Sequence, residues 1–291
     1  MGYKCFDVTI DEKIANIVLN RPEKRNSMIP EFWEELPQIV RDIDDNARAR
    51  VIVISSTGPH FTAGLDISSF AGAAIQSDDP EEQRLAKLQH GARFHDTVGS
   101  MQHTFSCLEE CRVPVIAAIQ GGCIGGGVDL VTACDMRYST ENAFFTIFEV
   151  NIGLTADVGT FPRIVKLIPE GVARELAYTG RRMPAQEAQA VGLLNRVLSD
   201  EETLRTEVMS VAREIASKAP MAVYGCKRAI NYARDHSTAD TLDFIGVWNA
   251  SMLQPEQIME AMAANAQKRP GDFVDLPKLN RGKVGDGDGS N

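Results

Sequence analysis

The chain has 291 residues, of which 44% are hydrophobic and 24% charged, which is an ordinary composition for a globular protein with a large buried core. Its formal net charge of −10 at pH 7 argues against a nucleic-acid binder and against an anionic-membrane binder, because both need a basic surface. No apolar run approaches the ~20 residues that span a bilayer, and the first residues do not match a secretory signal. We therefore expect a soluble, cytoplasmic protein.

The cysteines do not form a paired framework. Cys107 and Cys111 stand four residues apart on a predicted helix, a spacing that can bind a metal ion, but no second Cys/His pair lies near them in the sequence. We therefore expect buried free thiols and no metal site.

Strand and helix patterns alternate over the N-terminal part of the chain. Alternating apolar residues predict a strand at 6–10 and a neighbouring one at 14–19. Ser27 is placed to cap the helix that follows, and Pro30 is tolerated in the first turn of that helix. A short continuous apolar run at 51–54 predicts a buried strand. The helix is expected to turn one apolar stripe inward, formed by Trp33, Leu36, Ile39, Val40 and Ile43.

The middle of the chain continues this alternation. A small, polar and acidic segment at 71–80 is typical of a flexible loop, and a long helix is predicted at about 82–111. A buried strand at 114–119 then leads into a glycine cluster. Strand, strand and helix recur about three times before residue 180, which is typical of a mixed α/β fold.

The character of the chain changes near residue 200. Four helical patterns follow without an obvious strand, near 200–217, 220–235, 237–253 and 255–268. The residues from Arg281 onward have the composition of a disordered tail. We therefore expect an α/β core over residues 1–199, a helical unit over 200–280 and a tail over 281–291.

Backbone N–H groups are the first chemical feature. The glycine cluster at 121–129 follows a buried strand and opens a helix, and it matches neither the dinucleotide-binding fingerprint nor a P-loop. It does expose N–H groups at a helix N-terminus, where they can stabilise a negative oxygen, and glycine lets a ligand approach closely. The segment at 60–67 also follows a strand, although each segment taken alone is an ordinary turn or loop.

Three acids are the second chemical feature: Asp129, Glu149 and Asp157. Each has a simpler structural interpretation, such as helix-dipole stabilisation for Asp129 or a helix cap for Asp157. Their neighbours are largely apolar, however, which raises carboxyl pKa values toward those that proton transfer at neutral pH needs. No nucleophile elbow and no Ser/His or Cys/His pair is indicated by spacing. Acids and N–H donors together suit proton transfer beside a carbonyl group.

The segments at 60–67 and 121–129 together resemble the two-part signature of the crotonase, or enoyl-CoA hydratase/isomerase, superfamily. The resemblance runs from about residue 6 to about residue 278. It implies an α/β fold, a right-handed superhelix of strand-strand-helix units, with a helical C-terminal region used for trimer formation. It also implies an oxyanion hole in which the N–H groups of Leu65 and Gly126 hold the thioester oxygen of an acyl-CoA. The substrate would lie against Ala63, Gly64 and Gly125.

The acids indicate the subfamily. Hydratases of this superfamily carry glutamates at the positions of Asp129 and Glu149 and glycine at that of Asp157. The set found here resembles that of the Δ3,5-Δ2,4-dienoyl-CoA isomerases, as do the stretches at 124–137 and 144–160. The resemblance implies a homotrimer or homohexamer that acts in fatty-acid β-oxidation without a cofactor, since CoA is part of the substrate.

The implied reaction is a 1,5-proton shift from a 3,5-dienoyl-CoA to a 2,4-dienoyl-CoA through an extended dienolate. Such a shift needs acids at two separated carbons, so Glu149 and Asp157 are the expected pair and Asp129 supports them. Glu149 at C2 and Asp157 at C6 is the preferred assignment, although the sequence leaves the direction open. Two alternatives remain: a 2-enoyl-CoA hydratase, and a non-catalytic family member that binds acyl-CoA or RNA.

Overall fold

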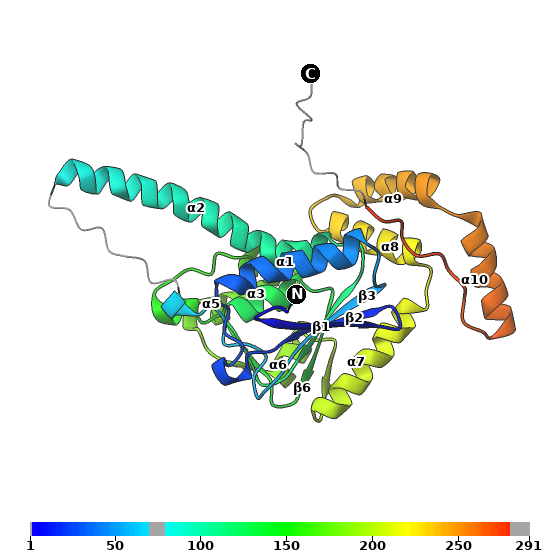
Figure 1. Ribbon diagram of the computed structural model, residues 1–291, viewed down its shortest axis with the longest axis horizontal. Helices are drawn as coiled ribbons and strands as arrows, with labels where there is room; N and C mark the ends of the chain where they lie inside the picture. Colours follow the sequence, from blue (N-terminus) through cyan, green and yellow to red (C-terminus); the bar gives the residue numbers. More distant parts are fainter. Residues whose placement is uncertain (1, 70–78, 280–291) are drawn as a thin grey trace, which may run out of the picture.

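A computed structural model of the chain describes residues 2–69 and 79–279 (Figure 1). The predicted tail, and the predicted loop at 71–80 apart from its last two residues, lie outside the described residues. The strands are β1 (Phe6–Asp11), β2 (Ile14–Leu19), β3 (Val51–Ser56), β4 (Val115–Ile119), β5 (Gly122–Ile124), β6 (Met136–Thr140), β7 (Phe144–Thr146), β8 (Met183–Pro184) and β9 (Arg196–Leu198). The α-helices are α1 (Pro30–Asp45), α2 (Pro80–Glu110), α3 (Gly126–Ala133), α4 (Thr160–Ile164), α5 (Glu170–Thr179), α6 (Ala185–Ala190), α7 (Glu201–Ala216), α8 (Pro220–Ala233), α9 (Thr238–Met252) and α10 (Pro255–Gln267). Short 3₁₀ helices are η1 (Pro22–Lys24), η2 (Ile67–Ser69) and η3 (Glu149–Ile152).

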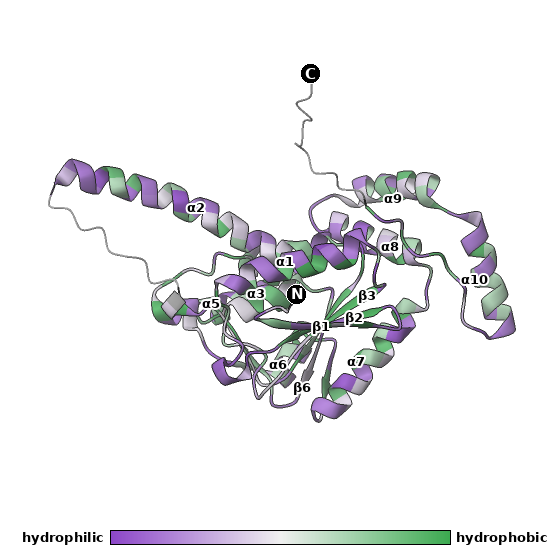
Figure 2. Cartoon of the chain, in the orientation of Figure 1, coloured by the Kyte–Doolittle hydropathy of each residue, from purple (hydrophilic) through white to green (hydrophobic). Residues whose placement is uncertain are grey.

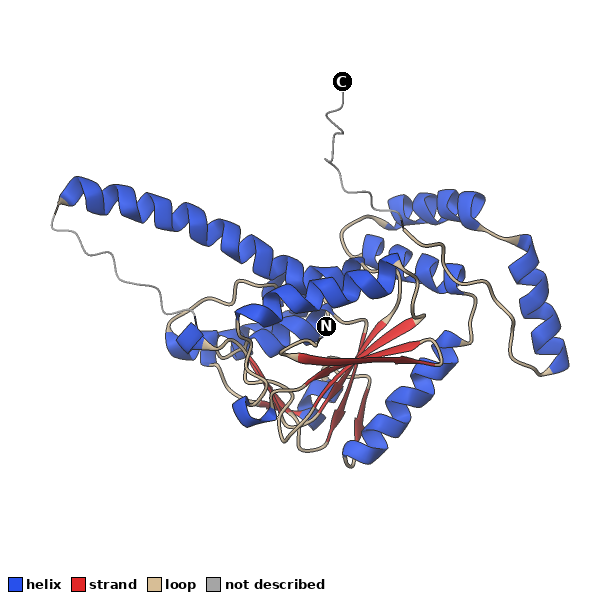
Figure 3. Ribbon diagram, viewed as in Figure 1, coloured by secondary structure: helices blue, strands red, loops and turns tan. Residues whose placement is uncertain are grey.

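Two sheets stack successive parts of the chain side by side (Figure 3). The six-stranded sheet has the order β1-β2-β3-β4-β6-β9, and all its pairs are parallel except the β1-β2 hairpin. The smaller sheet has the order β5-β7-β8, and isolated bridges from Thr62 to Cys123 and from Met28 to Leu65 extend its layer. Successive turns of the chain thus add strands or bridges to the two layers, which confirms the predicted α/β fold.

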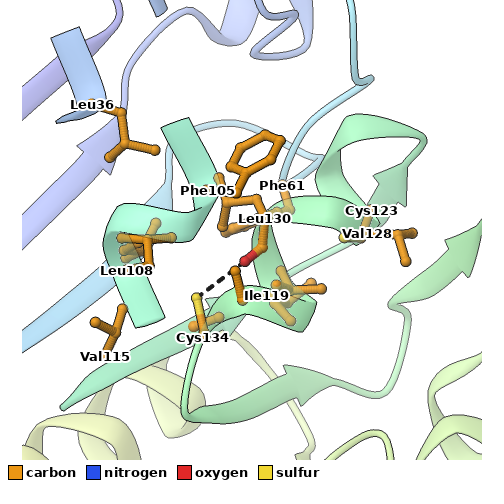
Figure 4. Close-up of a cluster of buried hydrophobic side chains, with 14 of the residues drawn as sticks. Leu36, Phe61, Phe105, Leu108, Val115, Ile119, Cys123, Val128, Leu130 and Cys134 are labelled. Carbon is orange, nitrogen blue, oxygen red and sulfur yellow. Dashed lines mark hydrogen bonds between the residues drawn. The ribbon is translucent and has the colours of Figure 1, made fainter. Parts of the chain in front are cut away.

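The large sheet is buried on both faces, between α1, α2 and α3 on one side and α7 on the other. In β3, Ile52 and Ile54 join the cluster under the first three helices, whereas Val51 and Val53 join the cluster under α7. This double burial explains why the strand reads as a continuous apolar run. In Figure 2, β2 and β3 are largely green, and the helices around the sheet carry much purple on their outer faces. Figure 4 shows the first cluster, in which α1, α2 and α3 meet β4 through Leu36, Phe105, Leu108, Val115, Ile119 and Leu130.

The C-terminal helices lie close to their predicted ranges. α7 packs directly on the sheet, because Leu204, Val208 and Ala212 belong to the cluster that contains Val53 and Ile116. α8 to α10 extend to one side of the body, and the outer half of α2 projects to the other (Figure 1). A division of the chain at residue 200 stays a prediction. No described helix is both long enough and apolar enough to cross a membrane.

Two local predictions are wrong. Ser27 does not cap α1: the N-cap is Ile29, which makes no side-chain capping bond, and Ser27 Oγ donates instead to Asp66 Oδ2 at 3.1 Å. A polar partner close in space, although distant in sequence, competes with the local cap. The thiols are buried as expected with one exception, since Cys226 is exposed.

The segment after α10, residues 273–279, returns to the core and is called the closing segment below. Leu279 N donates to Asp45 O at 2.8 Å, and Arg50 Nη2 donates to Phe273 O at 2.6 Å. Arg112 Nη1 donates to the carbonyl oxygen of Pro277 at 2.7 Å, while its Nε binds Asp44 Oδ1 at 2.8 Å. The Arg112 and Asp44 side chains are only 6% and 3% exposed, so the closing segment completes the partners of a buried ion pair.

Candidate active site

The segment around Gly64 is fixed by backbone hydrogen bonds on both sides. Thr62 N donates to Gly122 O at 3.1 Å and Ile124 N donates to Thr62 O at 3.2 Å, which ties the segment to β5. On the other side, Met28 N donates to Gly64 O at 2.8 Å. These bonds bring residues 62–65 beside the start of α3.

Two backbone N–H donors lie close together there. Gly64 has φ +78°, and an added Cβ would lie 2.6 Å from Ile124 O and 3.2 Å from Gly126 N, so only glycine fits this approach. Gly126 is the first residue of α3, and its N–H therefore has no acceptor within the helix. An added Cβ on Gly126 would lie 3.9 Å from Leu65 N. Neither of the two N–H groups has a hydrogen-bond acceptor among the residues that the structure describes.

The other residues predicted to contact substrate lie around these donors. Ala63 N donates to Arg25 O at 2.9 Å, and Gly125 N donates to Thr146 O at 3.0 Å. Gly125 has φ +53° and is the N-cap of α3. Their N–H groups are therefore occupied, and the free donors are those of Leu65 and Gly126.

Asp129 is fully buried on α3. Its Oδ1 accepts a hydrogen bond from Thr160 N at 2.6 Å, while its Oδ2 has no partner among the described residues. Burial, together with the negative charge of Glu149, raises the pKa of Asp129 to about 7, against the opposing effects of the Thr160 hydrogen bond and of Arg163. Asp129 thus binds the N-terminus of α4 with one oxygen and keeps a proton near neutrality.

Glu149 begins η3 and faces the glycines at the start of α3. A Cβ added to Gly125 would lie 3.0 Å from Glu149 Oε1. Glu149 Oε2 is buried and has no partner in the described part of the chain. Burial, and then the negative charge of Asp157, raises the pKa of Glu149 above the ordinary glutamate value. A half-buried carboxyl group next to the free N–H donors is therefore suited to accept a proton.

Asp157 lies in the turn before α4, and it is exposed. The N-cap of α4 is Gly159, and the side chain that accepts from the first N–H of this helix is that of Asp129, so the simpler interpretation of Asp157 as a helix cap is wrong. The backbone oxygen of Asp157 accepts a hydrogen bond from Gln102 Nε2 of α2 at 2.7 Å. The fold therefore brings the three acids to one place, along α3, η3 and the turn before α4.

Arg163 was not identified from the sequence. Its guanidinium group contacts α2 through Glu109, at 2.7 Å, and the turn before α4 through Gly159 O, at 3.3 Å. The only signal in the sequence is a lone basic residue in an otherwise apolar stretch at 161–165.

The comparisons with known proteins agree with this arrangement. Residues 9–276 match the model of a family described as enoyl-CoA hydratase/isomerase. A mitochondrial Δ3,5-Δ2,4-dienoyl-CoA isomerase from Mus musculus is 41% identical over 280 residues, which are 96% of this chain and 84% of that protein. A peroxisomal one from Arabidopsis thaliana is 36% identical over 278 residues, 94% of this chain and 99% of that protein.

Solved structures of the same family have this fold. An enoyl-CoA hydratase from Bacillus anthracis superposes with a TM-score of 0.81 at 30% sequence identity, over 93% of this chain and 99% of that one. An enoyl-CoA hydratase from Thermoplasma volcanium gives a TM-score of 0.76 at 27% identity, over 89% of this chain and 96% of that one.

The prediction of a cytoplasmic location is wrong, because these similar isomerases are named as mitochondrial or peroxisomal proteins. The family of the chain follows directly, since the match covers at least 94% of this chain and at least 84% of each of these two isomerases. This chain belongs to the enoyl-CoA hydratase/isomerase family.

Proposed function

We propose that this protein isomerises 3,5-dienoyl-CoA to 2,4-dienoyl-CoA in fatty-acid β-oxidation. The observation that carries the proposal is the set of three acids beside two free N–H donors. Dienoyl-CoA isomerases are 34–42% identical to this chain, which supports the same assignment. The reaction removes a proton from C2, adds one at C6 and shifts two double bonds. It therefore needs acidic groups and a site that stabilises a negative oxygen, and no cofactor besides the CoA that the substrate carries.

The thioester oxygen binds between Leu65 N–H and Gly126 N–H. These donors stabilise the negative oxygen that develops when C2 loses a proton, and they interact more weakly with the neutral carbonyl. Removing one donor of this kind typically lowers the rate on the order of 10²–10³-fold. The donors are held by the backbone bonds of residues 62–65, so they need little reorganisation during the reaction.

Glu149 removes the proton from C2. It lies against Gly125, next to the donor Gly126, and C2 is the carbon adjacent to the thioester carbonyl. The electron pair of the broken C–H bond spreads over the dienolate as far as C6 and the thioester oxygen. Asp157 then gives a proton to C6, and the two remaining double bonds settle at C2 and C4. Exchange of protons with water then returns both carboxyl groups to their starting states.

Asp129 supports the other two acids. Because its pKa is raised to about 7, it is partly protonated at neutral pH and does not add a full third negative charge beside Glu149. Its hydrogen bond to Thr160 N also fixes the turn that carries Asp157.

Hydration of a 2-enoyl-CoA is the alternative reaction. It needs a water molecule held near C3 by two acids, and Asp129 is one methylene group shorter than the glutamate that the hydratases carry at this position, with its Oδ1 already bound to Thr160 N. We therefore expect the wild-type protein to isomerise a 3,5-dienoyl-CoA far faster than it hydrates a 2-enoyl-CoA. Comparable rates would refute the isomerase assignment, and neither activity would favour a non-catalytic acyl-CoA or RNA-binding role.

The test follows the ultraviolet band of the conjugated 2,4-dienoyl thioester during incubation with a 3,5-dienoyl-CoA. Asp157→Asn should abolish most of this activity and leave binding of the CoA ester nearly unchanged, because the amide has almost the same shape but cannot transfer the proton. A variant with turnover within about two-fold of wild type would remove Asp157 from the mechanism.

The assembly proposed with this function is a homotrimer or a homohexamer made of two trimers. Support comes from apolar side chains that α9 and α10 leave exposed: Leu242, Val247, Met252, Ile258, Met259 and Met262. Light scattering should give three or six times the mass of a single 31.9 kDa chain. A single 31.9 kDa species at micromolar concentration would contradict the proposal.

A further inference from the structure

Arg163 links α4 to α2 through polar contacts that are largely shielded from water. Its Nε donates to Glu109 Oε2 at 2.7 Å and its Nη2 donates to Ser106 Oγ at 3.0 Å. The side chains of Arg163 and Glu109 are only 12% and 20% exposed. Arg234, the C-cap of α8, binds the other oxygen of the same carboxylate, Glu109 Oε1, at 2.6 Å. Glu109 is thus fixed by two guanidinium groups, and in turn it fixes the guanidinium of Arg163.

The opposite edge of this guanidinium holds the turn that carries Asp157. Arg163 Nη1 donates to Gly159 O at 3.3 Å, and it lies so close that a Cβ added to Gly159 would be 1.8 Å away. The next N–H along the chain, that of Thr160, is the donor to Asp129 Oδ1. At the other end of the turn, the backbone oxygen of Asp157 accepts from Gln102. The turn at 157–160 is therefore held by Gln102, Arg163 and Asp129.

We propose that Arg163 is a positioning residue for the second proton transfer: clamped by Glu109, it fixes the turn at 157–160 and so places the Asp157 carboxyl group opposite the distal carbon. The inference rests on the proposed isomerase function and extends it. Glu149 lies on η3 and makes no hydrogen bond to Arg163 among the described residues. The clamp thus holds the turn of Asp157 directly and makes no direct bond to Glu149, so the second proton transfer should depend on it more than the first.

Because the two proton transfers can be measured separately, a positioning role of Arg163 can be distinguished from a purely structural one. In D₂O, the return of the dienolate to substrate incorporates deuterium at C2, whereas its protonation by Asp157 forms the 2,4-diene. The experiment incubates full-length protein with a 3,5-dienoyl-CoA and measures diene formation by ultraviolet absorbance. Mass spectrometry of the recovered substrate measures deuterium at C2.

Arg163→Met should lower the kcat of isomerisation on the order of 10²-fold, because a displacement of ~1 Å at a reacting group has an effect of this size. KM should change by less than about threefold, and the ratio of C2 exchange to isomerisation should rise at least about tenfold. Arg163→Lys keeps the charge but not the fork of donors, so its ratio should fall between those of wild type and Arg163→Met. The control is Arg174→Met, which removes an exposed arginine of α5 that pairs with Glu170 and should leave the ratio unchanged.

Circular dichroism checks that each variant is folded. If Arg163→Met does not fold, Gln102→Met tests the other attachment of the same turn and should raise the ratio in the same direction. A folded variant in which exchange and isomerisation fall together, or in which neither changes, overturns the inference. Failure of wild-type protein to isomerise the substrate would instead refute the proposed function, so the two failures are distinguishable.

Discussion

Replacing Asp129 by asparagine should stabilise the protein, and the gain should grow as the pH rises. A pKa of about 7 for the buried carboxyl group, against 3.8 for an ordinary aspartate, corresponds to about 4 kcal/mol in favour of the protonated folded protein. Because the folded-state pKa is the raised one, this stabilisation is complete below about pH 3.8 and is lost as the pH rises through about 7. Asparagine cannot ionise, so the variant does not undergo this loss.

The free energy of unfolding of Asp129→Asn, minus that of wild type, should therefore increase by about 3 kcal/mol between pH 5 and pH 8. This difference is measured by urea unfolding at both pH values, with tryptophan fluorescence as the signal. Both proteins are compared at equal concentration, because assembly contributes to stability. Asp66→Asn is the control, since hydrogen bonding to Ser68 lowers the pKa of Asp66 and it stays ionised over this range. A difference for Asp129→Asn that is the same at both pH values would refute a burial-raised pKa.

Two further substitutions test the site and the core. Gly64→Ala should lower isomerase activity on the order of 10²-fold, measured by the appearance of the 2,4-diene, because its Cβ would collide with Ile124 O and displace the Leu65 N–H. A fully active Gly64→Ala protein would remove this turn from the oxyanion site. Arg112→Met should lower the free energy of unfolding by about 3–5 kcal/mol in urea titrations, because the buried Asp44 carboxylate loses its cation. The exposed pair lost in Arg174→Met should change it by less than about 1 kcal/mol, and equal losses in the two variants would contradict the reasoning.

Regular patterns of the sequence were sufficient for the long helices and for β1, β2, β3 and β4 of the large sheet, whereas β6 and β9 were not predicted. The strands at 51–54 and 114–119 stand out because both faces are buried, and the periodic C-terminal helices stand out because one face is apolar. The smaller layer was not predictable in this way, since single bridges such as Thr62 to Cys123 extend it and leave no periodicity. The cap predicted at Ser27 failed for a related reason: its partner, Asp66, is 39 residues away.

The candidate site was predictable mainly through the family resemblance. The three acids were already indicated by their largely apolar neighbours, and the resemblance gave their roles and the two donors; the described structure brings these groups together. It gave no indication of what each Asp129 oxygen contacts, because Thr160 lies 31 residues further along the chain. Arg163 was missed because its partner Glu109 is 54 residues away, and a lone arginine carries no local signal.

The order of strands in the large sheet, β1-β2-β3-β4-β6-β9, has a consequence for synthesis of the chain. Each new strand pairs with one that has already left the ribosome, so the sheet can grow in the direction of translation without waiting for later segments. The closing segment is the exception, because it contacts Arg50, Asp45 and Arg112, all made much earlier. Until it arrives, the ion pair of Arg112 and Asp44 lacks its last hydrogen-bond acceptor. Completion of this part of the core therefore waits for the closing segment, and chains truncated before residue 273 should keep this buried ion pair incompletely hydrogen-bonded.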